Sequence, residues 1–370
     1  MQFLPSSTQR LVLEYIRDGG AVARSEIAAS TGINPGALSR LMRELIEAGL
    51  VHEGTRIRAA RGQPPLPLSL NPGAAWSVGL SFSLHEIEVV GINFAGTCIA
   101  ERVVPLPEGN AEVILAQCAR LVRALVASGP QGTQPPIGLG VALPGYFNHA
   151  TPPKVETFAA LSALSGLDLS GLSGRFGLPT WIENNSTAAA LAEFYHRPDR
   201  QARTLGLINV GYGFSAGFIV GGRLYRGRAG NAGEIGRMYP RGTPRPSVLD
   251  LGDTLAAAGH PVTSTRALAD LCADPPPALR TWVRRAGQQL AHAMNMVDLI
   301  IAPDELVLGG QLPVDLAHML FAEVSAAQMD RPDRRIRVSQ LGPLAAAKGA
   351  AFLPLYHGFA PLTGTAQDQK

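Results

Sequence analysis

Polar side chains gather where a predicted strand meets a predicted helix in the middle of the chain. Residues 177–182 have the turn and the apolar content of a short buried strand, and residues 184–195 have the alanine and leucine content of a helix. Between them stand one carboxylate and two carboxamides, Glu183, Asn184 and Asn185. Such groups form hydrogen bonds with hydroxyl groups. Because open α/β sheets bind ligands at the carboxyl ends of their strands, we interpret this junction as a candidate ligand site.

The stretch Glu183-Asn-Asn-Ser-Thr-Ala-Ala189 resembles the Glu-Asn-Asp-Ala-Asn-Ala-Ala signature of the ROK family (repressor, open reading frame, kinase). The resemblance implies that Asn185 stands where the family's sugar kinases keep the aspartate that takes a proton from a sugar hydroxyl. A carboxamide cannot hold that proton near neutral pH, and a positioned general base contributes about 10²–10⁴ in rate. The replacement therefore predicts binding without turnover. The alternative is an asparagine-rich helix cap, since Asn and Ser are favoured at helix starts.

Two further motifs resemble the sugar side of that family's site. Val141-Ala-Leu-Pro-Gly145 is similar to its Pro-Gly turn, and Gly230-Asn-Ala-Gly-Glu-Ile-Gly236 is similar to its Ala-Gly-Glu-Ile-Gly-His motif, whose Glu and His bind sugar hydroxyls. Here Glu234 is kept and Arg237 replaces the histidine. Arg237 either satisfies Glu234 within the protein or binds an acidic sugar or sugar phosphate, and both alternatives stay open.

The residues expected to bind an effector are therefore Gly145, Glu183, Asn184, Asn185, Glu234 and Arg237. A cleft inherited from a kinase is concave, but descent alone does not guarantee that it still binds a ligand. The alternative is that these side chains now hold one loop against another.

Zinc is not expected. In many members of the family the histidine replaced by Arg237 is also a zinc ligand, and a Cys-x-Cys-Gly-x-x-Gly-Cys segment follows it. Residues 238–250 contain neither Cys nor His, so a tetrahedral site cannot be assembled locally. The cysteines, Cys98, Cys118 and Cys272, are isolated and odd in number, which indicates neither a disulfide framework nor a metal cluster. No metal and no cofactor is predicted.

The segments that resemble the family's phosphate loops are altered. Gly79-Leu-Ser-Phe-Ser-Leu-His85 corresponds to Asp-x-Gly-Gly-Thr but lacks the Asp that helps to organise magnesium, and Phe82 adds bulk where phosphate approach favours glycine. Asn209-Val-Gly-Tyr-Gly-Phe-Ser-Ala-Gly217 keeps several glycines but is crowded by aromatic residues, among them Tyr212. Leu306-Val-Leu-Gly-Gly310 resembles the strand and double glycine near the adenosine pocket. The architecture of a kinase without its nucleotide chemistry, and hence no enzyme activity, is predicted.

The first seventy residues predict three helices and a wing. Residues 8–17 and 25–30 have helical patterns, and a serine is expected to cap the second. Asn34 is a favoured N-cap and is followed by Pro35 and an apolar stripe. Residues 50–54 and 55–58 are expected to form the two strands of the wing. This order is typical of a winged helix-turn-helix that binds DNA, and a packing module for proteins is the alternative.

Basic and small polar residues lie off the apolar stripe of the third predicted helix and along the wing. No acidic residue occurs between Gly54 and Pro72, and the segment from Arg61 to Pro72 resembles the Gly-Arg-Pro-Pro linker of ROK repressors, with Gln63 replacing its arginine. Guanidinium groups at such places neutralise phosphates or enter the minor groove. The residues expected to contact DNA are Asn34, Gly36, Ser39, Arg40, Arg43, Arg56, Arg58, Arg61 and Gln63.

Composition and pattern set the architecture. The chain has 370 residues, 46% of them hydrophobic and 16% charged, which describes globular cores, while a net charge of +3 is too mild to identify a nucleic-acid binder alone. The opening stretch has neither a long apolar run nor a leader pattern, so a cytoplasmic protein without a membrane segment is expected. We predict an α/β fold with a winged helix-turn-helix and linker in residues 1–70 and a two-lobed, actin-like, sugar kinase-like domain in residues 71–370.

The resemblance implies a transcriptional regulator, a repressor of carbohydrate transport or metabolism genes. Its expected partners are an operator in double-stranded DNA, a sugar effector, and further copies of the chain in a homodimer or homotetramer. Two alternatives remain open. One is an active, ATP-dependent sugar kinase with a DNA-binding appendage, and the other is a regulator with a vestigial pocket that is controlled by a protein partner.

Overall fold

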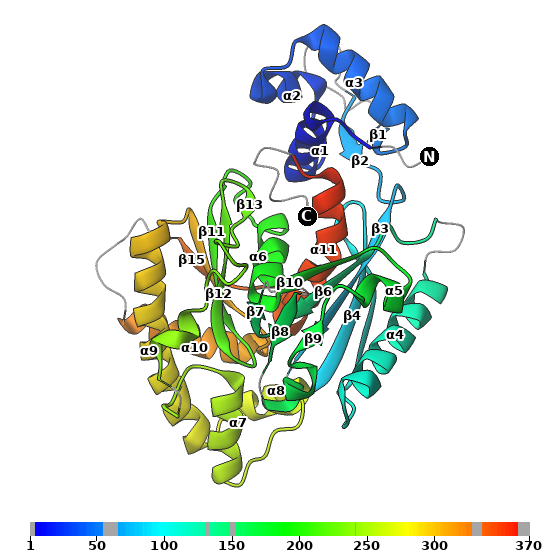
Figure 1. Ribbon diagram of the computed structural model, residues 1–370. Helices are drawn as coiled ribbons and strands as arrows, with labels where there is room; N and C mark the ends of the chain where they lie inside the picture. The colour runs from blue at the N-terminus through cyan, green and yellow to red at the C-terminus, as the bar shows by residue number, and fades with distance from the viewer. Residues whose placement is uncertain are drawn as a thin grey trace.

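The computed structural model describes residues 4–54, 66–83, 85–129, 134–148, 153–157, 159–240, 242–327 and 335–361. The chain forms a small N-terminal module that lies on top of a larger two-lobed core (Figure 1). The elements of the module are α1 (Ser7–Gly19), α2 (Arg24–Thr31), α3 (Pro35–Glu47), β1 (Val51–Glu53) and β2 (Leu68–Leu70). Among the described residues, no helix is both long and apolar enough to cross a membrane.

Local sequence chemistry explains where α3 begins. The Oδ1 atom of Asn34 accepts a hydrogen bond from the backbone N–H of Gly36 at 2.9 Å, and Pro35 occupies the first helical position. The apolar stripe then buries Leu38, Met42 and Leu45 against the other helices. The prediction of a serine cap on α2 was wrong, because its N-cap is Ala23, and the carboxylate of Glu26 accepts the Ala23 N–H instead.

The wing differs from its prediction. β1 pairs in antiparallel fashion with β2, at Val51 with Leu70 and Glu53 with Leu68, so the strand that pairs with β1 lies in the segment that was assigned to the linker. The alternation of buried Leu68 and Leu70 with Ser69 is a strand pattern that the prolines just before it obscured in the sequence. The predicted second strand, residues 55–58, lies outside the described residues.

The core contains two five-stranded sheets built on one plan. The first has the order β10-β6-β3-β4-β5 and the second the order β13-β12-β11-β14-β15. In each sheet three antiparallel strands are followed by two further strands that run parallel to the first of them. The strands are β3 (Trp76–Phe82), β4 (Glu86–Asn93), β5 (Cys98–Pro105), β6 (Leu139–Leu143), β10 (Thr180–Asn184), β11 (Leu205–Val210), β12 (Phe214–Val220), β13 (Arg223–Leu224), β14 (Glu305–Gly309) and β15 (Ile336–Val338).

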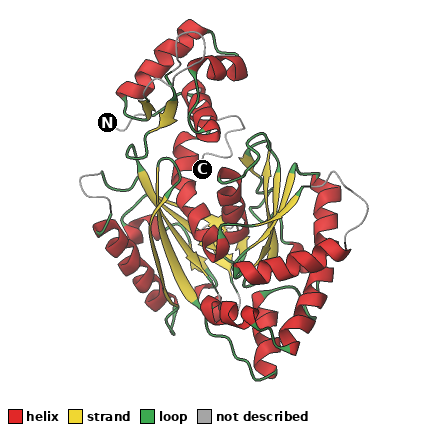
Figure 2. Cartoon of the chain, turned by 180° about the vertical axis from the view of Figure 1, so that it is seen from behind, coloured by secondary structure: helices red, strands yellow, loops and turns green. Residues whose placement is uncertain are grey.

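Two helices, α6 (Asn185–Tyr195) and α11 (Ala345–Phe359), lie side by side between the sheets, as Figure 2 shows from behind. α11 packs on β3 and β6, and α6 packs on β11 and β12. Their backbones approach closely because small residues face one another: a Cβ atom at Gly349 would lie 1.7 Å from the carbonyl oxygen of Ala188. The outer faces of the sheets are covered by α4 (Ala111–Ala127) on one side and by α9 (Pro277–Ile301) and α10 (Val314–Ala327) on the other.

Shorter elements complete the lobes. A three-stranded sheet, β7-β8-β9, follows β6, and helices α7 and α8 precede α9. Their bounds are β7 (Tyr146–Asn148), β8 (Lys154–Glu156), β9 (Leu167–Asp168), α5 (Leu172–Phe176), α7 (Val248–Ala257), α8 (Thr265–Ala273), and the 3₁₀ turns η1 (Ala159–Leu164), η2 (Ile235–Met238) and η3 (Gly342–Leu344). The fold is the predicted winged helix followed by a two-lobed α/β core.

Candidate functional site

The polar cluster lies where the parallel strands β6 and β10 both end. The two strands are in register from Thr180 with Leu139 to Asn184 with Leu143, so the Pro-Gly turn after β6 and the polar residues after β10 meet. The Nδ2 atom of Asn184 donates to the carbonyl oxygen of Gly145 at 3.1 Å. Gly145 has φ +140°, and a Cβ atom there would lie 2.4 Å from the carbonyl oxygen of Glu156. Only glycine fits this turn, because a side chain would push it away from Asn184.

The first turn of α6 has its own polar network. The Oδ1 atom of Asn184 accepts from the N–H of Ser186 at 2.8 Å and so caps the helix, as the alternative interpretation of this segment expected. Ser186 Oγ accepts from Asn209 Nδ2 at 3.1 Å and also bonds the hydroxyl of Ser215. Asn185, with 5% of its surface exposed, accepts one long bond of 3.4 Å from Ser186 Oγ. Its amide nitrogen donates no hydrogen bond to any described residue, so it is available to a ligand.

Two contacts join this strand edge to the second lobe. The Nε atom of Arg226 donates to the buried carboxylate of Glu183 at 2.5 Å. The side chain of Asn231 pairs with the backbone of Phe147, accepting its N–H at 2.7 Å and donating to its carbonyl oxygen at 2.8 Å. The charge of Glu183 is thus neutralised within the protein, and the distance between the lobes is fixed on this side.

Glu234 and Arg237 lie at either end of a short segment held tightly against β12. Cβ atoms at Gly233 and Gly236 would lie 2.0 and 2.3 Å from carbonyl oxygens of Ala216 and Phe214. Burial raises the pKa of the Glu234 carboxyl, while the charge of Arg237 opposes the rise. The two side chains form no ion pair within 4.0 Å, and the guanidinium of Arg237 lies 4.4 Å over the ring of Tyr146 instead, next to Gly145. Arg237 therefore does not satisfy Glu234 directly.

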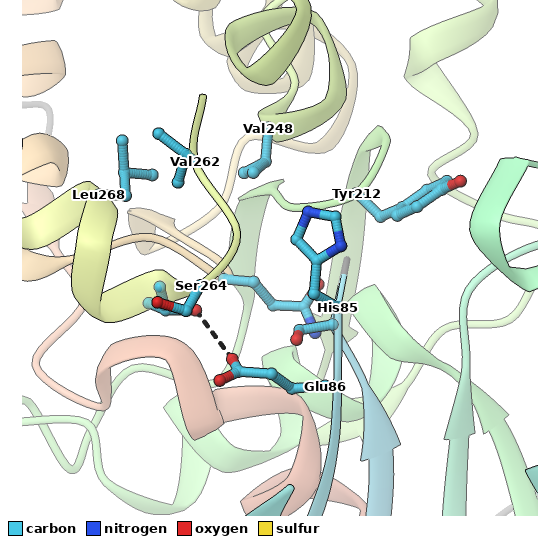
Figure 3. Close-up of a pocket in the computed structure, with 10 residues that line it drawn as sticks. His85, Glu86, Tyr212, Val248, Val262, Ser264 and Leu268 are labelled. Carbon is cyan, nitrogen blue, oxygen red and sulfur yellow. Dashed lines mark hydrogen bonds between the residues drawn. The ribbon is translucent and has the colours of Figure 1, made fainter. Parts of the chain in front are cut away.

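A second cleft between the lobes lies where the altered phosphate segments meet (Figure 3). Ser83, His85 and Glu86 line it from the first lobe, and residues of the β11–β12 turn, α7, α8 and the end of β14 line it from the second. Tyr212, only 2% exposed, and Gln311, whose Nε2 donates to the carbonyl oxygen of Phe82 at 2.6 Å, also line it, and the ring of Tyr212 points away from the other labelled side chains (Figure 3). The Thr265 hydroxyl donates to Glu86 at 3.2 Å and bridges the lobes.

The space left in this cleft is small. Its free volume is about 30 Å³, enough for one or two waters, whereas ligand pockets have roughly 300–1,000 Å³. The donor set beside Glu234 does not fit zinc, since a guanidinium replaces the imidazole. No group of three or more His, Cys, Asp or Glu side chains able to hold a metal ion is found among the described residues.

The candidate DNA surface is the outward face of α3. Asn34, Gly36, Ser39, Arg40 and Arg43 are all exposed. In the part of the chain that the structure describes, neither arginine forms an ion pair, so both charges are available to phosphates or bases. Gln9 of α1 donates to the Glu44 carboxylate at 2.8 Å and fixes α3 in place. The other predicted contacts, Arg56, Arg58, Arg61 and Gln63, lie outside the described residues.

Sequence reasoning missed several side chains of the site. Arg226 lies in a glycine- and arginine-rich turn that carries no recognisable motif, and Tyr146 directly follows the Pro-Gly turn. Asn231 is part of a motif that the sequence did identify, but only for its Glu. An asparagine between two small residues in a turn could have indicated such a contact. Its side-chain amide can form hydrogen bonds with a backbone N–H and carbonyl group, as that of Asn231 does with Phe147.

Comparison with known proteins gives consistent matches. A family described as ROK matches residues 78–253, and one described as winged helix-turn-helix DNA-binding matches residues 6–52. Over 97% of its length the chain is 32% identical to the uncharacterized protein y4fQ of Sinorhizobium fredii, of which it covers 94%. It is 28% identical to the xylose repressor of Caldicellulosiruptor bescii, with a match covering 61% of this chain but only 57% of the repressor. The crystal structure of a ROK family transcriptional regulator, a homolog of the E. coli MLC protein, matches 96% of this chain and 98% of its own, with a TM-score of 0.70 and 20% identity.

Proposed function

Because this chain belongs to the ROK family and begins with a winged helix-turn-helix, we propose that it is a DNA-binding transcriptional repressor of carbohydrate transport or metabolism genes. In this proposal the kinase-like core senses a sugar and does not phosphorylate it. The observation that carries it is that one helix, α6, connects the candidate sugar site to the DNA-binding module. α6 begins at Asn185, in the candidate sugar site, and its last turn lies against the DNA-binding module.

The contacts at the far end of α6 are specific. Arg197, just after the helix, is fully buried and donates to Asp18 of α1 at 3.0 Å. Its other N–H groups bond the carbonyl oxygens of Phe194, Arg200 and Ala202, so the guanidinium is held from several sides. Arg17 of α1 lies 5.3 Å from the centre of the Tyr195 ring.

The neighbouring helix α11 holds α1 as well. Arg10 donates to the carbonyl oxygens of His357 and Ala360, at 3.2 and 3.3 Å, near the end of α11. Arg17 also donates to the carbonyl oxygen of Phe94 at 3.1 Å. Since α6 has 11 residues, about 16 Å of rigid helix separates the candidate sugar site from this interface.

As a hypothesis, a sugar bound between the lobes shifts α6 and α11, and α1 follows them. In a homodimer, whose winged helices read half-sites about 34–36 Å apart or at multiples of that distance, a small rotation prevents simultaneous contact. A coupling free energy of about 1–3 kcal/mol suffices for regulation.

Footprinting of the purified protein on the DNA upstream of its own gene, with and without a panel of sugars, tests this proposal. We expect a protected site whose occupancy changes with one class of sugar. Arg43→Ala should weaken binding and lower the salt dependence by about one phosphate contact, whereas Arg123→Ala, on the exposed face of α4, should change neither. No protected site under any condition would refute a DNA-binding regulator.

Two assays address the alternatives. ATP-dependent formation of a phosphorylated sugar would support an active kinase, against which the small free volume beside Gln311 argues. Thermal unfolding in the presence of each sugar separates a working pocket from a vestigial one, since a ligand that binds only the folded state raises the midpoint. A midpoint that no sugar moves would favour control by a protein partner.

A further inference from the structure

The side chains of the candidate sugar site fall into two groups. Glu183 and Asn184 are bonded within the protein, to Arg226 and to Gly145 and Ser186. Asn185 keeps a free amide nitrogen. The side chains of Glu234 and Arg237 form neither a hydrogen bond nor an ion pair with any described residue, although the backbone N–H of Arg237 donates to the carbonyl oxygen of Glu234. The chemistry of a ligand at this site is therefore decided by one carboxamide, one carboxylate and one guanidinium.

Arg237 is held in a way that leaves its hydrogen-bonding edge open. The Cζ atom of Arg237 lies 4.4 Å from the centre of the Tyr146 ring, no described residue forms a hydrogen bond with the guanidinium, and the side chain as a whole is exposed. A cation on an aromatic face is fixed in orientation without being neutralised. The planar N–H fork then matches two oxygens of a carboxylate or a phosphate, a geometry that an imidazole in its place does not offer.

The charges around the site also favour an anionic ligand. Arg226 neutralises Glu183 at 2.5 Å, so Glu183 does not repel an incoming anion as a free carboxylate would. Tyr146 follows Gly145 directly, which places the guanidinium beside the turn that Asn184 holds. A neutral sugar uses the hydrogen-bonding capacity of Glu234 and Asn185 but supplies no anion to Arg237, whose charge acts on the Glu234 carboxyl without forming an ion pair with it.

We infer that the effector is a monosaccharide carrying one anionic group, a carboxylate or a phosphate, which binds the guanidinium of Arg237 while sugar hydroxyls bond Glu234 and Asn185. The inference rests on the proposed sugar-sensing function and specifies its ligand class. Hydrogen bonds to a charged group contribute about 1.5–3 kcal/mol, so the acidic sugar should bind about 10- to 100-fold more tightly than its neutral counterpart.

Isothermal titration of the full chain with matched sugars tests the inference. The neutral probes are glucose, galactose and xylose, the carboxylate probes are glucuronate and galacturonate, and the phosphate probe is glucose 6-phosphate. We expect an acidic sugar to bind at least about 10-fold more tightly than its neutral counterpart, and the better of the two acidic sets identifies the anionic group.

A pair of variants locates the anion. Arg237→His, which introduces the residue found in the family motif, should remove the preference for acidic sugars, and Arg123→His on the outer face of α4 should leave it unchanged. Equal affinity for neutral and acidic sugars would overturn the inference while leaving sugar sensing intact. A preference that survives Arg237→His would also overturn it, because the anion would then bind elsewhere. Absence of binding by every sugar would refute the sensing function itself, and the inference with it.

Discussion

The nucleotide side and the sugar side of the region between the lobes use their polar side chains differently. On the nucleotide side, Tyr212 and Gln311 are buried, Gln311 donates across to the carbonyl oxygen of Phe82, and about 30 Å³ of free volume remains. On the sugar side, glycines keep the loops close together while Asn185, Glu234 and Arg237 remain unbonded or nearly so. The nucleotide side is not fully satisfied by its own groups, because Gln311 Oε1 is a buried acceptor without a partner among the described residues. The two sides therefore differ in exposure: the unpaired guanidinium of Arg237 reaches solvent, whereas the side chain of Gln311 is buried.

The largest loss of stability should follow from truncating a buried aromatic side chain that lines the cleft on the nucleotide side. Tyr212→Ala removes a buried ring and should lower the free energy of unfolding by about 3–5 kcal/mol, as for other large aromatic truncations. Tyr225→Ala, at a ring that is 47% exposed, is the matched control and should cost no more than about 0.5 kcal/mol. Denaturant unfolding of both measures the difference. Similar small losses would mean that Tyr212 does not stabilise this cleft.

Removal of the hydrogen bonds between Asn231 and Phe147, which join the lobes on the sugar side, should cause an intermediate loss of stability. Asn231→Ala deletes both hydrogen bonds to the Phe147 backbone and should destabilise the protein by about 1–3 kcal/mol. Sugar binding should weaken with it, because the two sides of the site are no longer held at one distance. Gln117→Ala, which removes only an exposed contact with Arg120, serves as the control. Unaltered sugar binding in Asn231→Ala would show that the lobes need no such link.

A buried carboxyl next to the altered phosphate segment should give stability a pH dependence. Burial, and then the charge of Glu86, raise the pKa of Glu88 from 4.5 to about 8. A raised pKa means that the folded state holds a proton that the unfolded state releases, so stability should fall between about pH 4.5 and pH 8. The slope from this group is at most about 1.4 kcal/mol per pH unit. Glu88→Gln should flatten the curve over that window, and an unchanged slope would contradict the assignment.

The smallest change in stability should come from the residue on which catalysis would depend. Asn185→Asp keeps the shape of the side chain and disturbs a single hydrogen bond of 3.4 Å, so below about pH 4, where the buried carboxyl is neutral, it should change the free energy of unfolding by about 1 kcal/mol or less. It places a carboxylate at the position of the family's proton acceptor, yet phosphorylated sugar should not appear in the presence of ATP, because little free volume remains on the nucleotide side. Formation of phosphorylated sugar by this variant would show that the nucleotide side still binds ATP, which would contradict the difference between the two sides.

Local patterns allowed much of the fold to be predicted. Asn34 and Pro35 marked the start of α3, and the apolar run followed by asparagines marked the junction of β10 and α6, because capping and strand-end chemistry act within a few residues. The pairing of β1 with Leu68–Leu70 was missed, since proline-rich sequence hides a short strand.

The contacts between lobes could not be predicted in the same way. Arg226 meets Glu183 across 43 positions of sequence, and Asn231 meets Phe147 across 84. No periodicity connects residues so far apart, and only the packing of two complete sheets brings them together. For Arg237 the sequence left two partners open; the structure places its guanidinium over Tyr146 instead of in an ion pair with Glu234, and binding of an acidic sugar stays a proposal.

Arg197 fastens the winged helix to the core through Asp18 with no exposure to solvent. This contact and the hydrogen bonds of Arg10 to the end of α11 favour one orientation of the winged helix on the core. In a dimer of such protomers, the distance between the two winged helices would depend on how the cores associate. Binding should then tolerate changes of base sequence at single positions better than the insertion of half a helical turn between the half-sites.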